Sequence, residues 1–460
     1  MPTGDADPTT PAGGEPPTYP GSPYTCTICG CLCDDLELTA DSGRVVEARW
    51  ACELARPFLV GMSTIAVDTR SPRIAGRDAS AEEAVAEAAR ILAGSRAPLI
   101  LGLRRSTNEA VRKAVALADQ LGAAIEIGEA PAWARIAAMQ RGGAVGATLG
   151  EVKARADVIV YWACDPVATH PRHLERYSAD AMGRFASDGR AGRRVVVVDR
   201  EKTATADRAD LFLQVDPERE LDLLLVLRAL WREVALDPRR VLAATGHPLG
   251  ELQELAEILQ GARYGAWFVG AFAGRGPVGQ AEARHQAVTA LVRELGRRTR
   301  FVALGLGEAG NAHGAESVLG WQSGFAPGVD FGGGFPESLP GETSVAVRLA
   351  NGEFDCTVVV GAAALDTILD HRWDEMTAPP WIFVGSPDHE AFDRATVAFP
   401  AGTAGVDAAG TFTRVDGVSL PVRAVRPSRS PDEGGWLEAV GKAVAALRTG
   451  ANEPGTAVGR

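Results

Sequence analysis

Five of the seven cysteines in this 460-residue chain lie close together near its N-terminus. Cys26, Cys29 and Cys33 are spaced C-x2-C-x3-C, and Cys52 follows after eighteen intervening residues. Four converging thiolates suit a [4Fe-4S] cluster, although they also satisfy tetrahedral zinc. A zinc ribbon usually has two C-x2-C pairs and only one is present, so we expect a cluster, with zinc or an empty, vestigial site as alternatives. Cys31 falls outside this set, and its spacing fits packing better than ligation, although exchange with Cys29 or Cys33 stays open.

A predicted hairpin would bring the fourth cysteine back to the other three. Residues 36–50 alternate around Asp41-Ser42-Gly43, which is a turn signal between two strands. We therefore expect a small β module over residues 23–60 that holds an iron-sulfur cluster. A chain of 460 residues is too long for one core, so further domains must follow this module.

The rest of the chain alternates between apolar β-branched runs and amphipathic helices. This pattern predicts an α/β fold with two doubly wound domains, whose parallel sheets are covered on both faces. A capping box at Ser80 and Glu83 marks the start of one helix. The other predicted helices cover 108–121 and 218–234, and the predicted strands cover 98–102, 123–127, 156–162, 194–199, 211–215, 264–269, 300–304, 356–360, 381–384 and 396–399.

Polar residues follow two neighbouring predicted strands, at the end where open α/β sheets bind ligands. The strand 156–162 leads into Cys164, Asp165 and Pro166, and then into His170 and Arg172. The strand 194–199 ends at Asp199, which is followed by the basic residues Arg200 and Lys202. An acid beside basic residues could hold the base and phosphates of a nucleotide. Exposed turns with solvated charged side chains explain these residues about as well as a nucleotide-binding site does.

Composition and motifs exclude several classes of function. The net charge of −12 argues against a nucleic-acid-binding surface. No apolar run approaches the roughly 18 residues needed to span a bilayer. Clustered cysteines in a long chain indicate a metal site in a reducing cytoplasm rather than disulfides. Two G-x-G-x-x-G matches, at 274–279 and 305–310, lack the context of a nicotinamide site. We expect residues 1–22 and 449–460 to be a disordered lead and tail.

Several of these segments together resemble the B subunit of formylmethanofuran dehydrogenases, a family within the molybdopterin oxidoreductase superfamily. The similarity covers most of residues 24–430, and it is carried by Cys26–Asp35, Gly150–Pro166 with His170-Pro171-Arg172-His173, Val196–Thr203 and Ala408–Phe412. The resemblance implies an outer α/β domain over 61–140 and 336–448, which is split around an inner α/β domain over 141–335.

The resemblance also implies a cofactor and partners. In the family, a molybdopterin guanine dinucleotide cofactor with molybdenum or tungsten lies between the two domains. It would bind here at Cys164, Asp165, Pro166, His170, Arg172, Asp199, Arg200 and Lys202. The superfamily's C-terminal β-barrel has no room in this chain, and in the family a separate subunit supplies it, which implies a multi-subunit complex.

One departure from the family pattern is informative. Active members carry a metal-binding Cys or selenocysteine followed by His, upstream of the Gly150-Glu151-Val152-Lys153 element. Residues 123–150 contain neither Cys nor His, and Pro131-Ala132 fall at that place. Glu53-Leu54 also follow Cys52, where the family often has Lys or Gly.

These losses favour a related bacterial assembly, the formyltransferase/hydrolase complex. It moves a formyl group between tetrahydromethanopterin and a methanofuran-like carrier and hydrolyses it to formate, with both active sites on other subunits. We therefore expect a B subunit without redox activity and without catalytic residues. The alternatives are an active molybdenum or tungsten dehydrogenase, for which Cys164 is the other cysteine in a matched element, and another oxidoreductase of the superfamily.

Overall fold

A computed structural model describes most of the chain between residues 23 and 450. The described ranges are 23–41, 44–61, 67–127, 130–270, 278–307, 310–325, 328–339, 345–361, 379–426 and 428–450. The predicted lead, the tail beyond 450, the Ser42-Gly43 turn and most of the 274–279 motif lie outside these ranges. Within them, no helix combines the length and the apolarity that crossing a membrane requires.

The inner sheet has five parallel strands in the order β11-β10-β7-β8-β9. They are β7 (Val158–Trp162), β8 (Arg194–Asp199), β9 (Leu211–Gln214), β10 (Gly265–Val269) and β11 (Phe301–Gly305). Because β7 lies at the centre and later strands add on both sides, the sheet is doubly wound, as predicted. Every residue of β7 and β10 is buried, which explains their unbroken apolar runs.

Helices cover both faces of this inner sheet. One face packs against α8 (Glu220–Trp231), α9 (Pro238–Thr245), α10 (Leu249–Gln260) and α11 (Val278–Leu295). The opposite face packs against α5 (Leu149–Arg155) and α7 (His173–Tyr177), and it shares its core with the cysteine segment.

The outer sheet has eight strands in the order β12-β6-β5-β13-β14-β15-β3-β4. Its five central strands are parallel, namely β6 (Ala124–Glu126), β5 (Pro98–Gly102), β13 (Cys356–Val360), β14 (Trp381–Gly385) and β15 (Val397–Pro400). The edge strands β12 (Val329–Asp330), β3 (Arg73–Ile74) and β4 (Arg77–Asp78) pair antiparallel. The sequence pattern missed these edges because two-residue strands show no alternation.

Helices cover both faces of the outer sheet too. One face packs against α2 (Ala81–Gly94), α3 (Asn108–Leu121), α12 (Ala312–Ser323) and α17 (Glu433–Gly450). The other packs against α13 (Val345–Ala350) and α16 (Ala391–Arg394). The capping box at the start of α2 is confirmed, since the Ser80 hydroxyl accepts from the Glu83 amide and the Glu83 carboxylate accepts from the Ser80 amide.

The chain crosses between the two sheets earlier than the predicted boundaries at 140 and 335. The last outer strand before the crossing is β6, and α4 (Ala130–Gly142) already packs against α11 of the inner domain. On the return, α12 joins the core of the outer domain and β12 pairs with β6. The last helix of the outer domain, α17, runs to Gly450. Apolar periodicity locates a helix, but it does not tell which core the helix joins.

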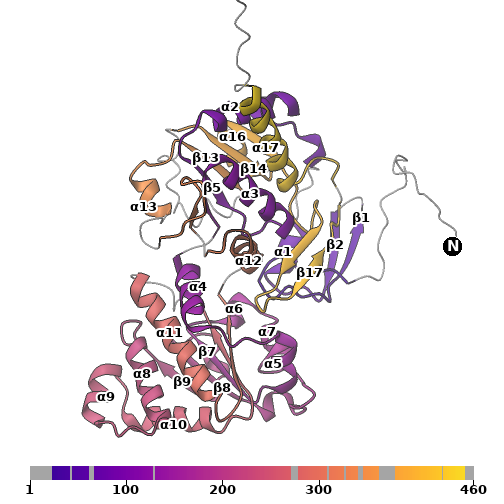
Figure 1. Ribbon diagram of the computed structural model, residues 1–460. Coiled ribbons are helices and arrows are strands. Elements are labelled where there is room, and N and C mark those ends of the chain that lie inside the picture. The colour runs from indigo at the N-terminus through magenta and orange to yellow at the C-terminus, as the bar shows by residue number, and fades with distance from the viewer. Residues whose placement is uncertain are drawn as a thin grey trace, which may run out of the picture.

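The cysteine module lies at the junction of the two sheets, where Figure 1 shows β1 and β2. Its strands β1 (Glu37–Asp41) and β2 (Arg44–Arg49) form the predicted antiparallel hairpin, and α1 (Ala55–Val60) follows. Leu32 of the cysteine segment packs against a second hairpin, β16 (Gly410–Thr413) and β17 (Ser419–Val422), through Phe412 and Val422.

A buried amide network fixes this second hairpin against the outer domain. The Asn311 side chain is fully buried, and its Nδ2 donates to the Ser106 carbonyl at 2.8 Å and to Asn108 Oδ1 at 2.9 Å. Its Oδ1 accepts from the Thr413 amide at 2.7 Å. Asn108 Nδ2 in turn donates to the hydroxyls of Thr411 and Thr413. One side chain therefore joins the start of α12, the start of α3 and β16.

We predict that Asn311→Ala lowers the free energy of unfolding by about 2–4 kcal/mol, because buried partners such as the Thr413 amide lose their hydrogen bonds. Urea unfolding followed by circular dichroism measures the change. The matched control is Asn351→Ala, whose Nδ2 donates to Glu353 at an exposed position and which should cost less than about 0.5 kcal/mol. Equal effects of the two substitutions would contradict the network's role.

Candidate metal centre

The cysteine segment is a loop closed by its own backbone. Tyr24 and Leu36 exchange two backbone hydrogen bonds, and the Cys26 amide donates to the Cys33 carbonyl at 2.8 Å. Leu32 has a φ of 43°, in the left-handed region that L-residues rarely adopt. A turn of this kind reverses the chain sharply, so the cysteines of one short segment face a common space.

That space is a pocket lined by all five N-terminal cysteines. Cys26, Cys29 and Cys33 reach it from the loop, and Cys52 reaches it from the end of the hairpin, as predicted. Cys31 lines the same pocket, although its spacing left it outside the four predicted ligands. The four predicted ligands therefore fit a cluster that needs four thiolates around one cube.

The protonation of these thiols reflects their surroundings. Burial raises the pKa of Cys26 well above its usual range and raises the pKa of Cys33 to about 12. A hydrogen bond between the Cys29 and Cys31 side chains lowers the pKa of Cys29 and raises that of Cys31. Burial therefore favours the neutral thiol at Cys26 and Cys33, and metal binding there would release protons.

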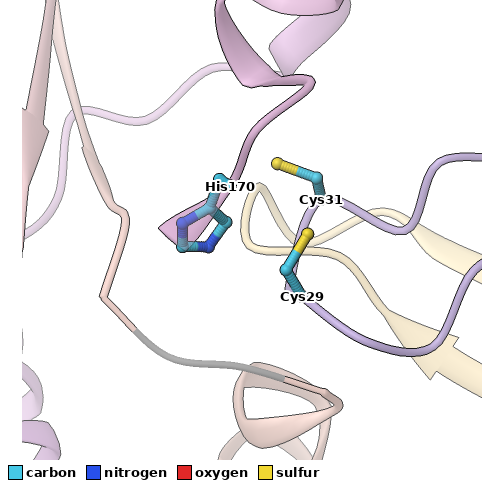
Figure 2. Close-up of side chains that lie close together, drawn as sticks. All are labelled: Cys29, Cys31 and His170. Carbon is cyan, nitrogen blue, oxygen red and sulfur yellow. The ribbon is translucent and has the colours of Figure 1, made fainter. Parts of the chain in front are cut away.

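A histidine from the inner domain stands beside two of the cysteines. The ligand atoms of Cys29, Cys31 and His170 all lie within 4.8 Å of one another, and all three residues are buried (Figure 2). Nδ1 of His173 lies 3.7 Å from the Cys31 sulfur. Sequence reasoning assigned His170 to the pterin cofactor and missed this neighbourhood, because 139 residues separate His170 from Cys31 and no local spacing links them.

Arg172, another predicted cofactor residue, clamps the cysteine loop. Its guanidinium donates to both oxygens of Asp35 at 2.8 Å, and its Nε donates to Glu175 at 2.7 Å. Arg176, one turn further along α7, pairs with Asp34 at 2.8 Å and also with Asp35. Arg172 also lines the cysteine pocket. The same side chains therefore join the loop to the inner domain and place positive charge beside it.

Two of the residues directly after β7, Cys164 and Asp165, form hydrogen bonds to other residues of the chain. The Cys164 thiol is buried and donates to the Phe268 carbonyl at 3.6 Å, and burial raises its pKa well above the usual range. Asp165 accepts hydrogen bonds from the amide and the hydroxyl of Thr205. Pro166 is the first residue of α6 (Pro166–Thr169). Their predicted contact with a cofactor stays a prediction.

The residues after β8 lie beside those after β7, because Trp162 and Val198 are partners in adjacent parallel strands. Asp199 is buried, its Oδ1 accepts from the Arg200 amide at 2.7 Å, and burial raises its pKa. Lys202 pairs with Asp207 at 2.8 Å. An open hollow at this edge is lined by Arg200, Gln214, Asp216, Pro217, Arg219, Thr245, Gly246 and His247.

A second pocket lies between the two domains and includes Gly30 of the cysteine loop. It is lined by Gly30, Arg135, Val269, Gly270, His285, Gly305, Leu306, Gly307, Gly310, His313, Thr413 and Val415, and we call it the glycine pocket. Its charged and titratable side chains, Arg135, His285 and His313, are not among the site residues that the sequence predicted. Gly270 must be glycine, since a Cβ there would lie 1.9 Å from the Ala163 carbonyl oxygen.

The described residues of the glycine pocket include no cysteine. The thiol of Cys164 bonds to the Phe268 carbonyl and does not line the pocket. Pro131-Ala132 lie in the first turn of α4. The residues present therefore fit a four-thiolate cluster, but they do not fit molybdenum or tungsten held by a protein thiolate.

Comparison with known proteins supports the resemblance. No family model matches the chain. The chain is 31% identical over 414 residues to the B subunit of the tungsten-containing formylmethanofuran dehydrogenase 2 of Methanocaldococcus jannaschii, a match that covers 87% of this chain and 92% of the relative. It is 29% identical over 289 residues to the B subunit of the formyltransferase/hydrolase complex Fhc of Methylorubrum extorquens, a match that covers 62% of this chain and 73% of the relative.

Solved structures share the fold. A chain of the formyltransferase/hydrolase complex (FhcABCD) from Methylorubrum extorquens, crystallised with methylofuran, matches with a TM-score of 0.67 and 25% identity, over 82% of this chain and 100% of that one. The acetylene hydratase of Pelobacter acetylenicus matches with a TM-score of 0.64 and 11% identity, over 93% of this chain and 70% of that one. The second match shows the fold alone.

We predict that the Arg172–Asp35 pair contributes about 1–2 kcal/mol of coupling to stability, because it is bidentate and partly buried. A double-mutant cycle with Arg172→Gln and Asp35→Asn measures this coupling by urea unfolding. The Lys202–Asp207 pair is the matched control, since both of its side chains are more than 60% exposed. Its coupling should stay below about 0.5 kcal/mol, and equal coupling in the two pairs would contradict the clamp.

A pH dependence is expected from His285, whose pKa is lowered to about 3 by burial, with Arg135 and Arg284 adding to the effect. A depressed histidine pKa contributes stability that is present above about pH 6.5 and is lost as the pH falls toward 3. The stability advantage of the wild type over His285→Gln should therefore shrink by about 2 kcal/mol between pH 7 and pH 5. Urea unfolding at the two pH values measures it, and a constant difference would show that His285 does not titrate as stated.

Proposed function

The chain belongs to the family of formylmethanofuran dehydrogenase B subunits, and from this premise we propose that it is a B subunit without redox activity. Its place would be in a formyltransferase/hydrolase complex of tetrahydromethanopterin-linked one-carbon metabolism. The observation that carries the proposal is the absence of Cys and His from residues 123–150. Active family members hold their metal with a Cys–His pair in this stretch.

The surroundings of that stretch support the proposal. Molybdenum and tungsten in the family need a soft protein ligand, and no cysteine is among the described residues of the glycine pocket. Asp165, Arg172 and Lys202, which the resemblance assigned to the pterin dinucleotide, already bond to Thr205, Asp35 and Asp207. We therefore propose that the dinucleotide has been lost, while Cys26, Cys29, Cys33 and Cys52 still hold a [4Fe-4S] cluster.

The role of the chain in such a complex would be structural. The transferase and hydrolase sites would lie on other subunits of a cytoplasmic assembly, and a separate subunit would supply the β-barrel. Two observations support this assignment, namely the similarity to an Fhc B subunit and the match to a whole chain of the FhcABCD complex. No catalytic residue is proposed in this chain.

A second candidate function is an active molybdenum or tungsten dehydrogenase. The identity of 31% to a tungsten-containing relative and the five cysteines around one pocket favour it. In that case Cys164 would have to ligate the metal, and its thiol would have to leave the buried position against the Phe268 carbonyl.

We predict that the anaerobically purified complex contains about four iron atoms per chain and neither molybdenum nor tungsten. Because the proposed cluster absorbs visible light, Cys29→Ala should abolish the absorbance. The matched control Cys356→Ala changes a buried cysteine in β13, away from the pocket, and should retain it. One elemental scan of the preparations measures all three metals. About one molybdenum or tungsten atom per chain would refute the loss of the cofactor.

A further inference from the structure

Three buried side chains around the cysteine loop are arranged for a single metal ion. The ligand atoms of Cys29, Cys31 and His170 lie within 4.8 Å of one another. In a tetrahedral zinc site, bonds of about 2.3 Å to sulfur and about 2.0 Å to nitrogen place neighbouring ligand atoms roughly 3.5–4 Å apart. Small side-chain rotations would therefore bring these three atoms to one ion. Only Cys29 of this group belongs to the predicted quartet.

The hydrogen bonds of His170 prepare one of its nitrogens for a metal. The Thr169 hydroxyl has one proton and donates it to the Asp165 carbonyl at 2.8 Å. The same oxygen lies 2.8 Å from His170 Nδ1. In the tautomer that carries its proton on Nδ1, the hydroxyl accepts a hydrogen bond from Nδ1 and a lone pair is left on Nε2, which is the usual arrangement of a metal-binding imidazole.

Nε2 of His170 has no hydrogen-bond partner in the described part of the chain. The residue is only 3% exposed, and Nε2 is buried without a hydrogen-bond partner there. A buried acceptor that is left unpaired is unfavourable. Figure 2 shows the ring beside the sulfur atoms of Cys29 and Cys31. A cation between them would use this lone pair.

His173 lies next to the sulfur of Cys31. Its Nδ1 lies 3.7 Å from the Cys31 sulfur, close enough to donate a hydrogen bond to a thiolate there. The ring is fully buried and packs edge-on against Phe268, with a centroid distance of 4.6 Å. Partners of this kind orient metal ligands and commonly change metal affinity by about 10–100-fold.

We propose that Cys29, Cys31 and His170 hold one zinc ion when the chain does not carry a cluster. Two thiolates and a neutral imidazole suit zinc, and the fourth position is left for another donor. Binding releases one proton from each of the two thiols. Because both metal sites need Cys29, zinc and the proposed cluster exclude each other on one chain. The inference rests on the proposed function only for this exclusion.

The test uses the full-length chain after anaerobic removal of iron by a chelator. Zinc is titrated in competition with a chromophoric chelator, and we expect about one ion per chain. X-ray absorption at the zinc edge should show two sulfur scatterers together with nitrogen. Cys31→Ser and His170→Gln should each weaken zinc binding roughly 100-fold, whereas Cys52→Ser, the matched cysteine control, should leave it unchanged.

Iron-sulfur reconstitution of the same variants gives the opposite pattern and separates the two proposals. Cys52→Ser should lose the visible absorbance of the cluster, while Cys31→Ser and His170→Gln should keep it. If the chain binds zinc but never assembles a cluster, the proposed cluster is wrong and the zinc site stands. Four sulfur scatterers, or loss of zinc in Cys52→Ser, would overturn the zinc site, as would the absence of stoichiometric binding. If a variant fails to fold, the X-ray absorption spectrum of the wild type still tests the zinc site, because it must show two sulfur scatterers together with nitrogen.

Discussion

The geometry of the metal centre depends on how the cysteine loop is held between the two domains. Arg172 of the inner domain binds both oxygens of Asp35 at 2.8 Å. The Gly310 amide, at the return crossing, donates to the Ile28 carbonyl, and the Val415 amide donates to the Gly30 carbonyl, both at 3.0 Å. A loop this short has little core of its own. The convergence of the cysteines is therefore a property of the whole chain rather than of its first sixty residues.

The cysteine loop contributes to two pockets that differ in their metal-binding residues. The cysteines surround one pocket, and Gly30 lines the glycine pocket between the domains. Such an arrangement suits electron transfer between a cluster and a second cofactor. Here the first site has its cysteines, whereas no cysteine is among the described residues of the second. Under the proposed function, the chain has the fold of the family's B subunit but lacks the ligand that a redox reaction would need.

Much of the fold could be predicted because local signals agreed with the final packing. Helix α3 begins and ends as predicted, since Thr107 caps its start and Gly122, with a φ of 72°, ends it. The buried strands β5, β8 and β13 also match their predicted residues. Local sequence does not determine which core a helix joins, so the packing of α4 and α12 could not be read from their periodicity.

The candidate site was harder to predict, because side-chain partners are distant in sequence. The cysteine spacing predicted that four cysteines meet, and Cys26, Cys29, Cys33 and Cys52 do line one pocket, while their role as ligands stays a prediction. It could not show that Arg172 pairs with Asp35, or that His170 lies beside Cys29. Charged residues at strand ends look alike whether they bind a cofactor or one another. The assignment of Asp199 and Arg200 to a nucleotide therefore stays a prediction.

The most direct test asks whether the purified complex performs redox chemistry. The complex is incubated anaerobically with the formylated carrier and an oxidised viologen dye, and the colour of the reduced dye is followed. We predict no dye reduction above the blank, while the same preparation transfers the formyl group between its carriers. Dye reduction in proportion to the amount of complex would contradict a B subunit without redox activity.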